Sequence, residues 1–257
     1  MYVLRGTITA ALVLGWTLAL LPLQMLAFRR RGSLSRYLPV LYHRVAARII
    51  GLRIDVVGRP VAQKSVLFVA NHASWLDIVV LGSVLEAGFI TKDDVAAWPG
   101  IGLLARLQGS VFISRRRYRT RDQADQIAAR LKDGQSLVLF PEGTSNDGRR
   151  TLTFRSGYFS VAERWSGPAP LPVQPVSIAY VRHHGLPIGR NDMPAFAWYG
   201  DMELLPHLWN LMCHGGAFEA RVEFHEAQSM AGYPSRKELA AQCHRVVAGG
   251  ANPGGKA

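Results

Sequence analysis

Residues 65–77 read "SVLFVANHASWLD", and they decide how the rest of the chain is interpreted. The first six residues are mostly apolar, which is typical of a strand buried inside a parallel sheet. The next residues place His72 five positions before Asp77, and Ser74 is a plausible N-cap for a helix that begins there. The segment therefore predicts a strand, a polar turn and a helix, the unit from which α/β domains are built.

Short apolar runs and helical patterns alternate along most of the remaining chain. Helical patterns cover residues 74–88 and 120–134, and Gly134 is a plausible helix end. We expect an α/β fold with a mainly parallel central sheet flanked by helices and preceded by N-terminal membrane-associated helices. The expected strands span residues 65–70, 89–91, 110–113, 136–140, 173–180 and 220–224.

An apolar stretch without charges precedes this α/β pattern. Between Arg5 and Arg29 lie 23 uncharged residues, enough for a helix of ~34 Å to cross a hydrocarbon core of ~30 Å. Arginines at 29–31 follow at once, whereas a signal peptide ends in small residues. We expect a retained membrane helix with the rest of the chain on the cytoplasmic side. Pro22 and Gln24 favour the alternative, a helix that lies partly in the bilayer.

The stretch after the arginines has the pattern of a basic amphipathic helix. Its apolar residues recur at steps of three and four, and arginines fall between them. Such a helix is suited to anionic lipid headgroups, and an ordinary surface helix packed on a core is the alternative. The apolar positions are Leu34, Tyr37, Leu38, Leu41, Tyr42, Val45 and Ile49.

Composition and charge narrow the possible partners. The 257 residues can bury one sizeable core, and 30 Lys and Arg against 18 Asp and Glu give a net charge of +12. This charge favours nucleic acid, an anionic membrane or phosphorylated substrates. We expect no nucleic-acid partner, because no known nucleic-acid-binding motif stands out. Two cysteines without a CxxC motif favour a reducing compartment, and the histidines lack zinc spacing, so we expect no metal.

Polar clusters follow three of the expected strands. "NHASWLD" follows the first, "SRRRYRTR" the third and "PEGTS" the fourth. Because ligands of open α/β sheets bind outside the carboxyl ends of the strands, we expect these clusters to meet on one rim. His72 backed by Asp77 could act there as a general base on a substrate hydroxyl, since no GxSxG nucleophile occurs. The alternative is a helix-capping aspartate beside a structural histidine.

The other two clusters suggest how a substrate could be bound. Glu142 could accept hydrogen bonds from a polyol-like headgroup, and Gly143 would let the backbone approach a ligand closely. Arg115 could grip a phosphate with two parallel hydrogen bonds.

Taken together, the motifs resemble the glycerolipid acyltransferases of the lysophosphatidic acid acyltransferase type. "NHASWLD" matches their NHxxxxD motif, "GSVFISR" is similar to their second block, "FPEGTS" matches the third, and "LPVQPVSIAY" looks like the fourth. The resemblance runs from residue 66 to residue 180. Ser114 departs from it, because the family often has an acidic residue before the arginine.

The resemblance assigns a role to each motif residue. His72 would be the catalytic base and Asp77 its partner. Arg115, Glu142 and Gly143 would bind the phosphate and glycerol of the acceptor. The supporting residues of that pocket would be Thr144 and Ser145.

The resemblance also implies a reaction and a location. An acyl chain would pass from acyl-CoA or acyl carrier protein to the free hydroxyl of 1-acyl-sn-glycerol 3-phosphate, giving phosphatidic acid, with no bound cofactor. The alternative acceptor is lyso-ornithine lipid or another lysophospholipid; a lipid hydrolase and a non-catalytic lipid or nucleic-acid binder are the competing classes. We expect a bacterial inner-membrane protein with its catalytic domain on the cytoplasmic side. Residues 1–52 would form the membrane-anchoring and amphipathic helices, residues 53–248 the acyltransferase domain, and residues 249–257 a disordered tail.

Overall fold

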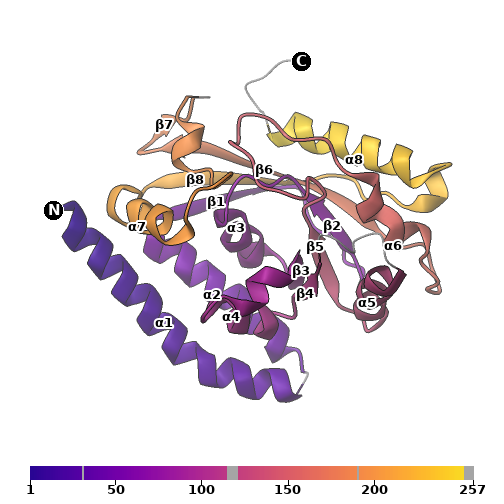
Figure 1. The fold of residues 1–257 in the computed structure, drawn as a ribbon, viewed down its shortest axis with the longest axis horizontal. Coiled ribbons are helices and arrows are strands. Elements are labelled where there is room, and N and C mark those ends of the chain that lie inside the picture. Colours follow the sequence, from indigo (N-terminus) through magenta and orange to yellow (C-terminus); the bar gives the residue numbers. More distant parts are fainter. Residues whose placement is uncertain (31, 115–120, 190, 252–257) are drawn as a thin grey trace.

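A mainly parallel sheet forms the centre of the molecule (Figure 1). The computed structural model describes residues 1–30, 32–114, 121–189 and 191–251. The strand order is β1-β8-β6-β2-β5-β3-β4, and β7 pairs with β6. Among the described strands, β6 pairs antiparallel with β7 and β8, and the other strand pairs are parallel. The strands are β1 (Leu52–Val57), β2 (Leu67–Ala70), β3 (Ala87–Lys92), β4 (Val111–Ile113), β5 (Ser136–Leu139), β6 (Val173–His183), β7 (Leu186–Pro187) and β8 (Phe218–Phe224).

Helices cover both faces of this sheet, which confirms the expected fold class (Figure 1). The α-helices are α1 (Tyr2–Arg30), α2 (Leu34–Ile50), α3 (Leu76–Val84), α4 (Ile101–Leu107), α5 (Arg121–Lys132), α6 (Ser160–Glu163), α7 (Leu204–His214) and α8 (Arg236–Ala251). Short 3₁₀ segments are η1 (Asp93–Ala97), η3 (Ser156–Phe159), η4 (Met193–Ala195) and η5 (Met230–Gly232).

Two hydrophobic cores lie on opposite faces of the sheet, because side chains alternate along each strand. Phe68 and Ala70 of β2 pack with residues of α2 and α3, whereas Leu67 and Val69 pack with residues of α5 and α8. The carboxyl end of β2 therefore emerges between two filled layers, and the loop after it is held in a fixed position.

Several observed elements differ from the expected ones. Strand β1 was not expected; Gly51 ends α2 with a φ of 83° and turns the chain into this strand. Helix α3 begins one residue later than a Ser74 cap implies, with Trp75 at the N-cap position. Helix α8 continues to Ala251, so residues 249–251 are helical, and the rest of the expected tail lies outside the described residues.

Helix α1 is attached to the domain near both of its ends. Near its start, the Arg5 guanidinium donates hydrogen bonds to the carbonyl oxygens of Cys213 and Gly215, which end α7. Near its end, Gln24 Nε2 donates to the carbonyl oxygens of Ser35 (3.0 Å) and Leu107 (2.7 Å). Within the described residues, α1 is the one helix long and apolar enough to cross a membrane.

Candidate active site

His72 and Asp77 meet at the carboxyl end of β2. Nδ1 of His72 lies 2.8 Å from Oδ2 of Asp77, and the Asp77 side chain is fully buried. The same carboxylate oxygen accepts hydrogen bonds from the backbone N–H groups of Ala73 (2.8 Å) and Ser74 (2.9 Å). Asp77 therefore fixes the loop that leads into α3 and orients the imidazole at the same time.

Tyr180 adds a partner to Asp77 that the sequence interpretation missed. Its hydroxyl donates a hydrogen bond of 2.7 Å to Asp77 Oδ1, and its ring stacks on Phe196. Burial and the neighbouring Asp77 raise the pKa of Tyr180 well above its ordinary value, so the hydroxyl stays protonated and donates. One signal was available in the sequence: a tyrosine at the end of an expected buried strand needs a partner for its hydroxyl.

Asn71 sets the point at which the chain leaves β2. Its side chain is buried, accepts a hydrogen bond from the Ile178 N–H (2.8 Å) and donates one to the Ile178 carbonyl oxygen (2.9 Å). The Asn71 side chain thus takes the place of a backbone pair and continues the hydrogen bonding between β2 and β6. His72 then follows in the loop, with its ring stacked on Phe140 at a centroid distance of 4.1 Å.

Glu142 ties the loop after β5 to the loop that carries His72. Its carboxylate accepts hydrogen bonds from the His72 N–H (2.8 Å), the Leu152 N–H (3.0 Å) and the Asn146 amide (2.6 Å). Asn146 in turn donates its amide and its backbone N–H to the His72 carbonyl oxygen. Burial raises the pKa of Glu142 to about 7, although the donors that it accepts from lower it.

These contacts show what Glu142 does within the fold. The residue is 1% exposed and is not among the residues that line the cavity described below. It holds the backbone of His72 in place, and its expected contact with a headgroup stays a prediction. The sequence showed a carboxylate next to a turn, but it did not show that Asn146 and Leu152 fold over that carboxylate.

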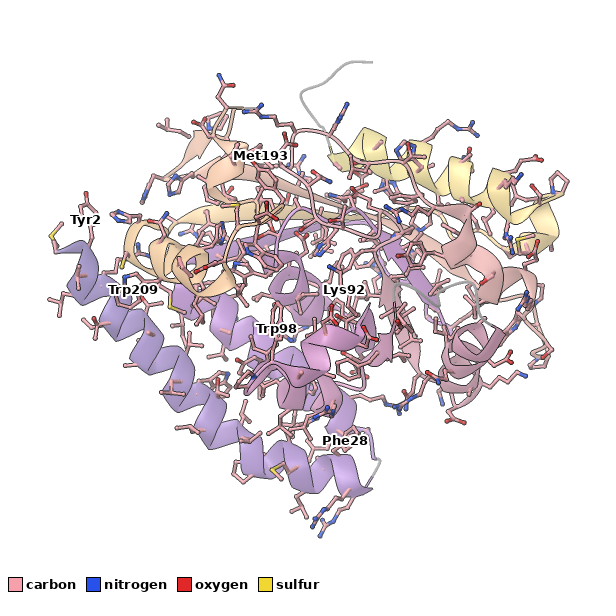
Figure 2. The ribbon with its side chains drawn as sticks, in the orientation of Figure 1. Tyr2, Phe28, Lys92, Trp98, Met193 and Trp209 are labelled. Atoms are coloured by element: carbon pink, nitrogen blue, oxygen red, sulfur yellow. The ribbon has the colours of Figure 1, made fainter. Side chains whose placement is uncertain are left out.

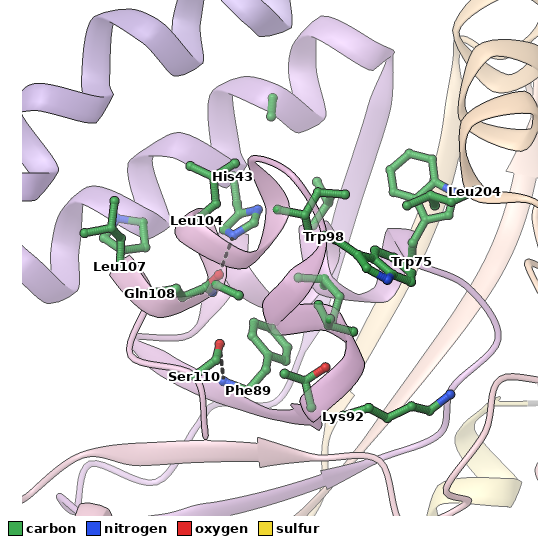
Figure 3. Close-up of a pocket in the computed structure, with 18 of the residues that line it drawn as sticks. His43, Trp75, Phe89, Lys92, Trp98, Leu104, Leu107, Gln108, Ser110 and Leu204 are labelled. Atoms are coloured by element: carbon green, nitrogen blue, oxygen red, sulfur yellow. Dashed lines mark hydrogen bonds between the residues drawn. The ribbon is translucent and has the colours of Figure 1, made fainter. Parts of the chain in front are cut away.

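A cavity of about 510 Å³ extends from His72 under helices α1, α2 and α4. This volume falls in the range of small-molecule sites, and most of the wall is apolar. Figure 3 shows Trp75, Trp98 and Leu204 toward one side of this cavity and Leu104 and Leu107 toward the other. Apolar side chains from distant parts of the chain meet here, among them Val13, Leu20, Leu38, Ile78, Phe89 and Leu208.

Three of the expected substrate-binding residues border the cavity near His72. Gly143, Thr144 and Ser145 all line it. Gly143 has a φ of 74°, and a Cβ on it would lie 2.8 Å from the hydroxyl oxygen of Tyr158, so the turn requires glycine. The structure thus brings His72, Asp77 and this turn together on one rim, whereas Arg115 lies outside the described residues.

An imidazole held by a buried carboxylate thus borders a mostly apolar cavity. The sequence model of the family named Acyltransferase matches residues 53–179. The chain belongs to this acyltransferase family, and it is an acyltransferase of the lysophospholipid type. The expected family is therefore confirmed.

Known relatives differ in the acceptor that their names give. The chain is 41% identical over 241 residues to the lyso-ornithine lipid O-acyltransferase of Brucella abortus (strain 2308), with 92% of this chain and 90% of that protein covered. It is 32% identical over 171 residues to the 1-acyl-sn-glycerol-3-phosphate acyltransferase of Neisseria gonorrhoeae, with 65% of this chain and 62% of that protein covered.

The crystal structure of the 1-acyl-sn-glycerophosphate acyltransferase PlsC from Thermotoga maritima has the same fold. The TM-score is 0.67, and the match covers 98% of this chain and 97% of that chain. At 20% identity, this likeness bears on the fold alone.

Proposed function

We propose that this protein transfers an acyl chain from a thioester donor to the free hydroxyl of lyso-ornithine lipid. The choice of this acceptor rests on the 41% identity to the Brucella abortus enzyme. That identity extends over nine-tenths of both chains, far beyond the motif region. The donor is acyl-CoA or acyl carrier protein, as the family chemistry requires. The second candidate acceptor is 1-acyl-sn-glycerol 3-phosphate, which the relative from Neisseria gonorrhoeae supports at 32% identity.

The geometry supports a direct transfer with His72 as the base. Asp77 occupies Nδ1 of the imidazole, so Nε2 is the nitrogen that takes the proton from the acceptor hydroxyl. The hydroxyl oxygen then attacks the thioester carbonyl carbon, a C–O bond forms and the C–S bond breaks. The proton returns from Nε2 to the leaving sulfur. Asp77 stabilises the imidazolium while it exists.

The cavity supports the lipid part of the proposal. An acyl chain whose carboxyl end lies next to His72 would run along the apolar wall and be shielded from water. The turn formed by Gly143, Thr144 and Ser145 lies beside His72 and would contact the polar part of a substrate.

We further propose that α1 lies along the membrane surface and does not cross the bilayer. Arg5 and Gln24 attach α1 to the domain near both ends, so a crossing would break contacts with α7 and α4. Many apolar residues of α1 are exposed, and Figure 2 shows Tyr2 and Phe28 toward its two ends with Trp209 of α7 beside it. This face suits the cytoplasmic leaflet of the inner membrane, whose anionic lipids would attract the basic chain.

The catalytic assignment is tested by His72→Ala. Loss of the general base should lower kcat by about 10²–10⁴-fold, while the variant stays folded and bound to vesicles. Transfer of a radiolabelled palmitoyl group from palmitoyl-CoA to lysolipid measures the rate, and circular dichroism and vesicle flotation serve as controls. A folded, membrane-bound variant with near-normal turnover would show that another group is the base.

The acceptor is tested by competition between two lysolipids. Purified protein receives palmitoyl-CoA with equal amounts of lyso-ornithine lipid and 1-acyl-sn-glycerol 3-phosphate, and mass spectrometry measures both products. We expect mainly ornithine lipid. Mainly phosphatidic acid would reverse the assignment, and release of free fatty acid without either product would indicate a hydrolase.

A further inference from the structure

A hydrogen bond joins helix α7 to the loop between β2 and α3, residues 71–75, which carries His72. The indole N–H of Trp75 donates to Nδ1 of His207 over 3.0 Å, and the two rings meet edge to face with centroids 6.4 Å apart. His207 is only 8% exposed and takes no part in the proton transfer at His72. The bond therefore connects the loop that carries the base to a buried residue 132 positions along the chain.

His207 accepts this bond as a neutral ring. An indole nitrogen can only donate, so Nδ1 of His207 has a lone pair and the ring hydrogen lies on Nε2. Burial lowers the pKa of His207 below its ordinary value, although the backbone of Ala197 counteracts this in part. The ring is therefore neutral at physiological pH, and its Nδ1 stays an acceptor for Trp75.

The chain that leads into α7 holds the same loop by its backbone. The Trp198 N–H donates to the Ala73 carbonyl oxygen over 2.8 Å. This bond fixes the course of the loop one residue after His72, but it leaves the torsions of the Trp75 side chain free. The bond to His207 fixes those torsions, so the two contacts have different roles.

Trp75 forms part of the cavity wall beside the base. Trp75 and His72 both line the cavity, together with Leu204 and Leu208 of α7. Figure 3 shows Trp75 and Leu204 toward the same side of it. A substrate whose reacting atom lies at Nε2 of His72 would contact the indole near its reacting end. Small misplacements of reacting atoms lower rates by large factors, so the orientation of this ring should affect the reaction.

We propose that His207 is a positioning residue of the acyl transfer and acts through Trp75. By accepting the indole hydrogen, it keeps the ring in the orientation that forms the wall beside His72. Without this acceptor, the indole N–H would lack its partner on α7, and the ring would turn toward another one. The inference rests on the proposed function, because it takes the cavity as the place where the lipid substrate reacts.

Two substitutions of similar size test the acceptor. Asparagine places an amide oxygen where His207 has Nδ1, whereas leucine has no acceptor. We expect His207→Leu to lower kcat by roughly three- to tenfold, the effect of one lost hydrogen bond. KM should change by less than about twofold, because the rest of the apolar wall still binds the chain. His207→Asn should restore most of kcat. Palmitoyl transfer from palmitoyl-CoA to lyso-ornithine lipid gives both constants.

His214→Leu is the matched control. It makes the same change in the same helix, at an exposed ring that contacts Tyr2 of α1, and it should keep the wild-type kcat. A double substitution shows whether His207 acts through Trp75. Once Trp75→Phe has removed the indole N–H, the addition of His207→Leu should lower kcat no further.

Hydrogen exchange follows the bond itself. The full chain is prepared in nanodiscs with isotope-labelled tryptophan, and the indole signal that is missing from Trp75→Phe belongs to Trp75. Exchange of this indole hydrogen for solvent deuterium should be slow in wild type and in His207→Asn. In His207→Leu it should be at least ~10-fold faster, because the protecting acceptor is gone.

The outcomes separate the two proposals. A wild-type kcat in His207→Leu, an equal loss in His207→Asn, fully additive losses in the double variant or unchanged exchange in His207→Leu would each overturn the inference. If wild-type protein transfers no acyl group to any lysolipid, the proposed function fails, and the exchange measurement still shows whether the bond exists. Should His207→Leu not fold, Trp75→Phe removes the same bond from the donor side, and an unchanged kcat there would overturn the inference equally.

Discussion

At the residue scale, the Asp77 carboxylate is surrounded by hydrogen-bond donors. Two backbone N–H groups and the Tyr180 hydroxyl surround the carboxylate in addition to His72. A buried carboxylate needs such partners, because burial without them strongly disfavours its charge. The site therefore holds the carboxylate next to the imidazole without exposing it to water.

Tyr180 is expected to contribute to the rate by fixing Asp77. Tyr180→Phe removes one donor from the carboxylate but keeps the ring that stacks on Phe196. We expect kcat to fall by about 10-fold, the effect of one hydrogen bond to a charged group, with little change in KM. Steady-state kinetics with the lysolipid varied measure both constants. An unchanged kcat would show that the backbone donors alone hold Asp77.

Glu142 is expected to make stability depend on pH. Because burial raises its pKa from 4.5 to about 7, the folded protein holds this proton more tightly than the unfolded chain does. That stabilisation is fully present below pH 4.5 and is lost as the pH rises through about 7. Wild-type stability should therefore fall relative to Glu142→Gln over this interval, by at most ~3 kcal/mol.

Thermal midpoints of wild type and Glu142→Gln in detergent, measured from below pH 4.5 to above pH 7, test this expectation. A constant difference between the two proteins across the interval would mean that Glu142 ionises in the folded state as it does in the unfolded one. The absolute difference matters less, because glutamine replaces one acceptor oxygen by a donor and loses hydrogen bonds at every pH.

The sequence identified part of this site for a clear physical reason. His72 and Asp77 are separated by one helix start, so local geometry alone brings them together. Glu142 and Tyr180 are different, because their partners lie 70 and 103 positions away along the chain. Only the sheet order, which places β2 between β5 and β6, determines those contacts.

At the element scale, the packing of α1 on α7 depends on a glycine. Gly6 is buried, and a Cβ there would collide with the Cys213 sulfur, whereas Gly15 of the same helix has open space around its Cα. We expect Gly6→Leu to destabilise the protein by about 1–3 kcal/mol through overpacking. It should also lower activity, since α1 contributes Val13 and Leu20 to the cavity.

Gly15→Leu is the matched control for this prediction. It makes the same chemical change in the same helix, and it should be neutral or slightly stabilising because leucine favours helix more than glycine does. Thermal midpoints and acyl-transfer rates of the two variants give the comparison. Equal effects of both substitutions would indicate that α1 is not packed on α7 in the active protein.

The elements themselves were largely predictable, because apolar runs bounded by turn residues mark buried parallel strands. Strand β1 was not predicted, because its first residues continue the apolar spacing of the helix before it. The left-handed Gly51 was the available signal for that boundary. The two-residue β7 is too short to leave any pattern.

At the scale of the whole molecule, exposed apolar side chains gather on α1, α4 and α7. Leu205 of α7 is 73% exposed, and Ile101 and Leu103 of α4 are exposed as well. If this face enters the membrane, Leu205→Glu should weaken binding to vesicles that contain anionic lipid by about 10-fold or more, because burial of a leucine is worth ~1.5–3 kcal/mol.

Leu186→Glu provides the comparison for Leu205→Glu. Leu186 is 71% exposed but lies on β7, away from α4 and from the C-terminal part of α1 (Figure 1). Vesicle flotation should show a large loss of membrane binding for Leu205→Glu and almost none for Leu186→Glu. Equal losses, or no loss in either, would place the membrane contact elsewhere. Added salt should weaken binding of both, since the net charge is +12.

The position of α1 has a practical consequence for anyone who wishes to study this enzyme in solution. Trimming residues 1–33 would be the obvious way to gain solubility, yet this segment forms one side of the apolar cavity. Its lining residues are Val13, Thr17, Leu20, Leu21 and Gln24. In the shortened protein, the cavity would lose this wall and its apolar side chains would be exposed to water. Detergent or nanodisc preparations of the full chain are therefore the suitable material for kinetics.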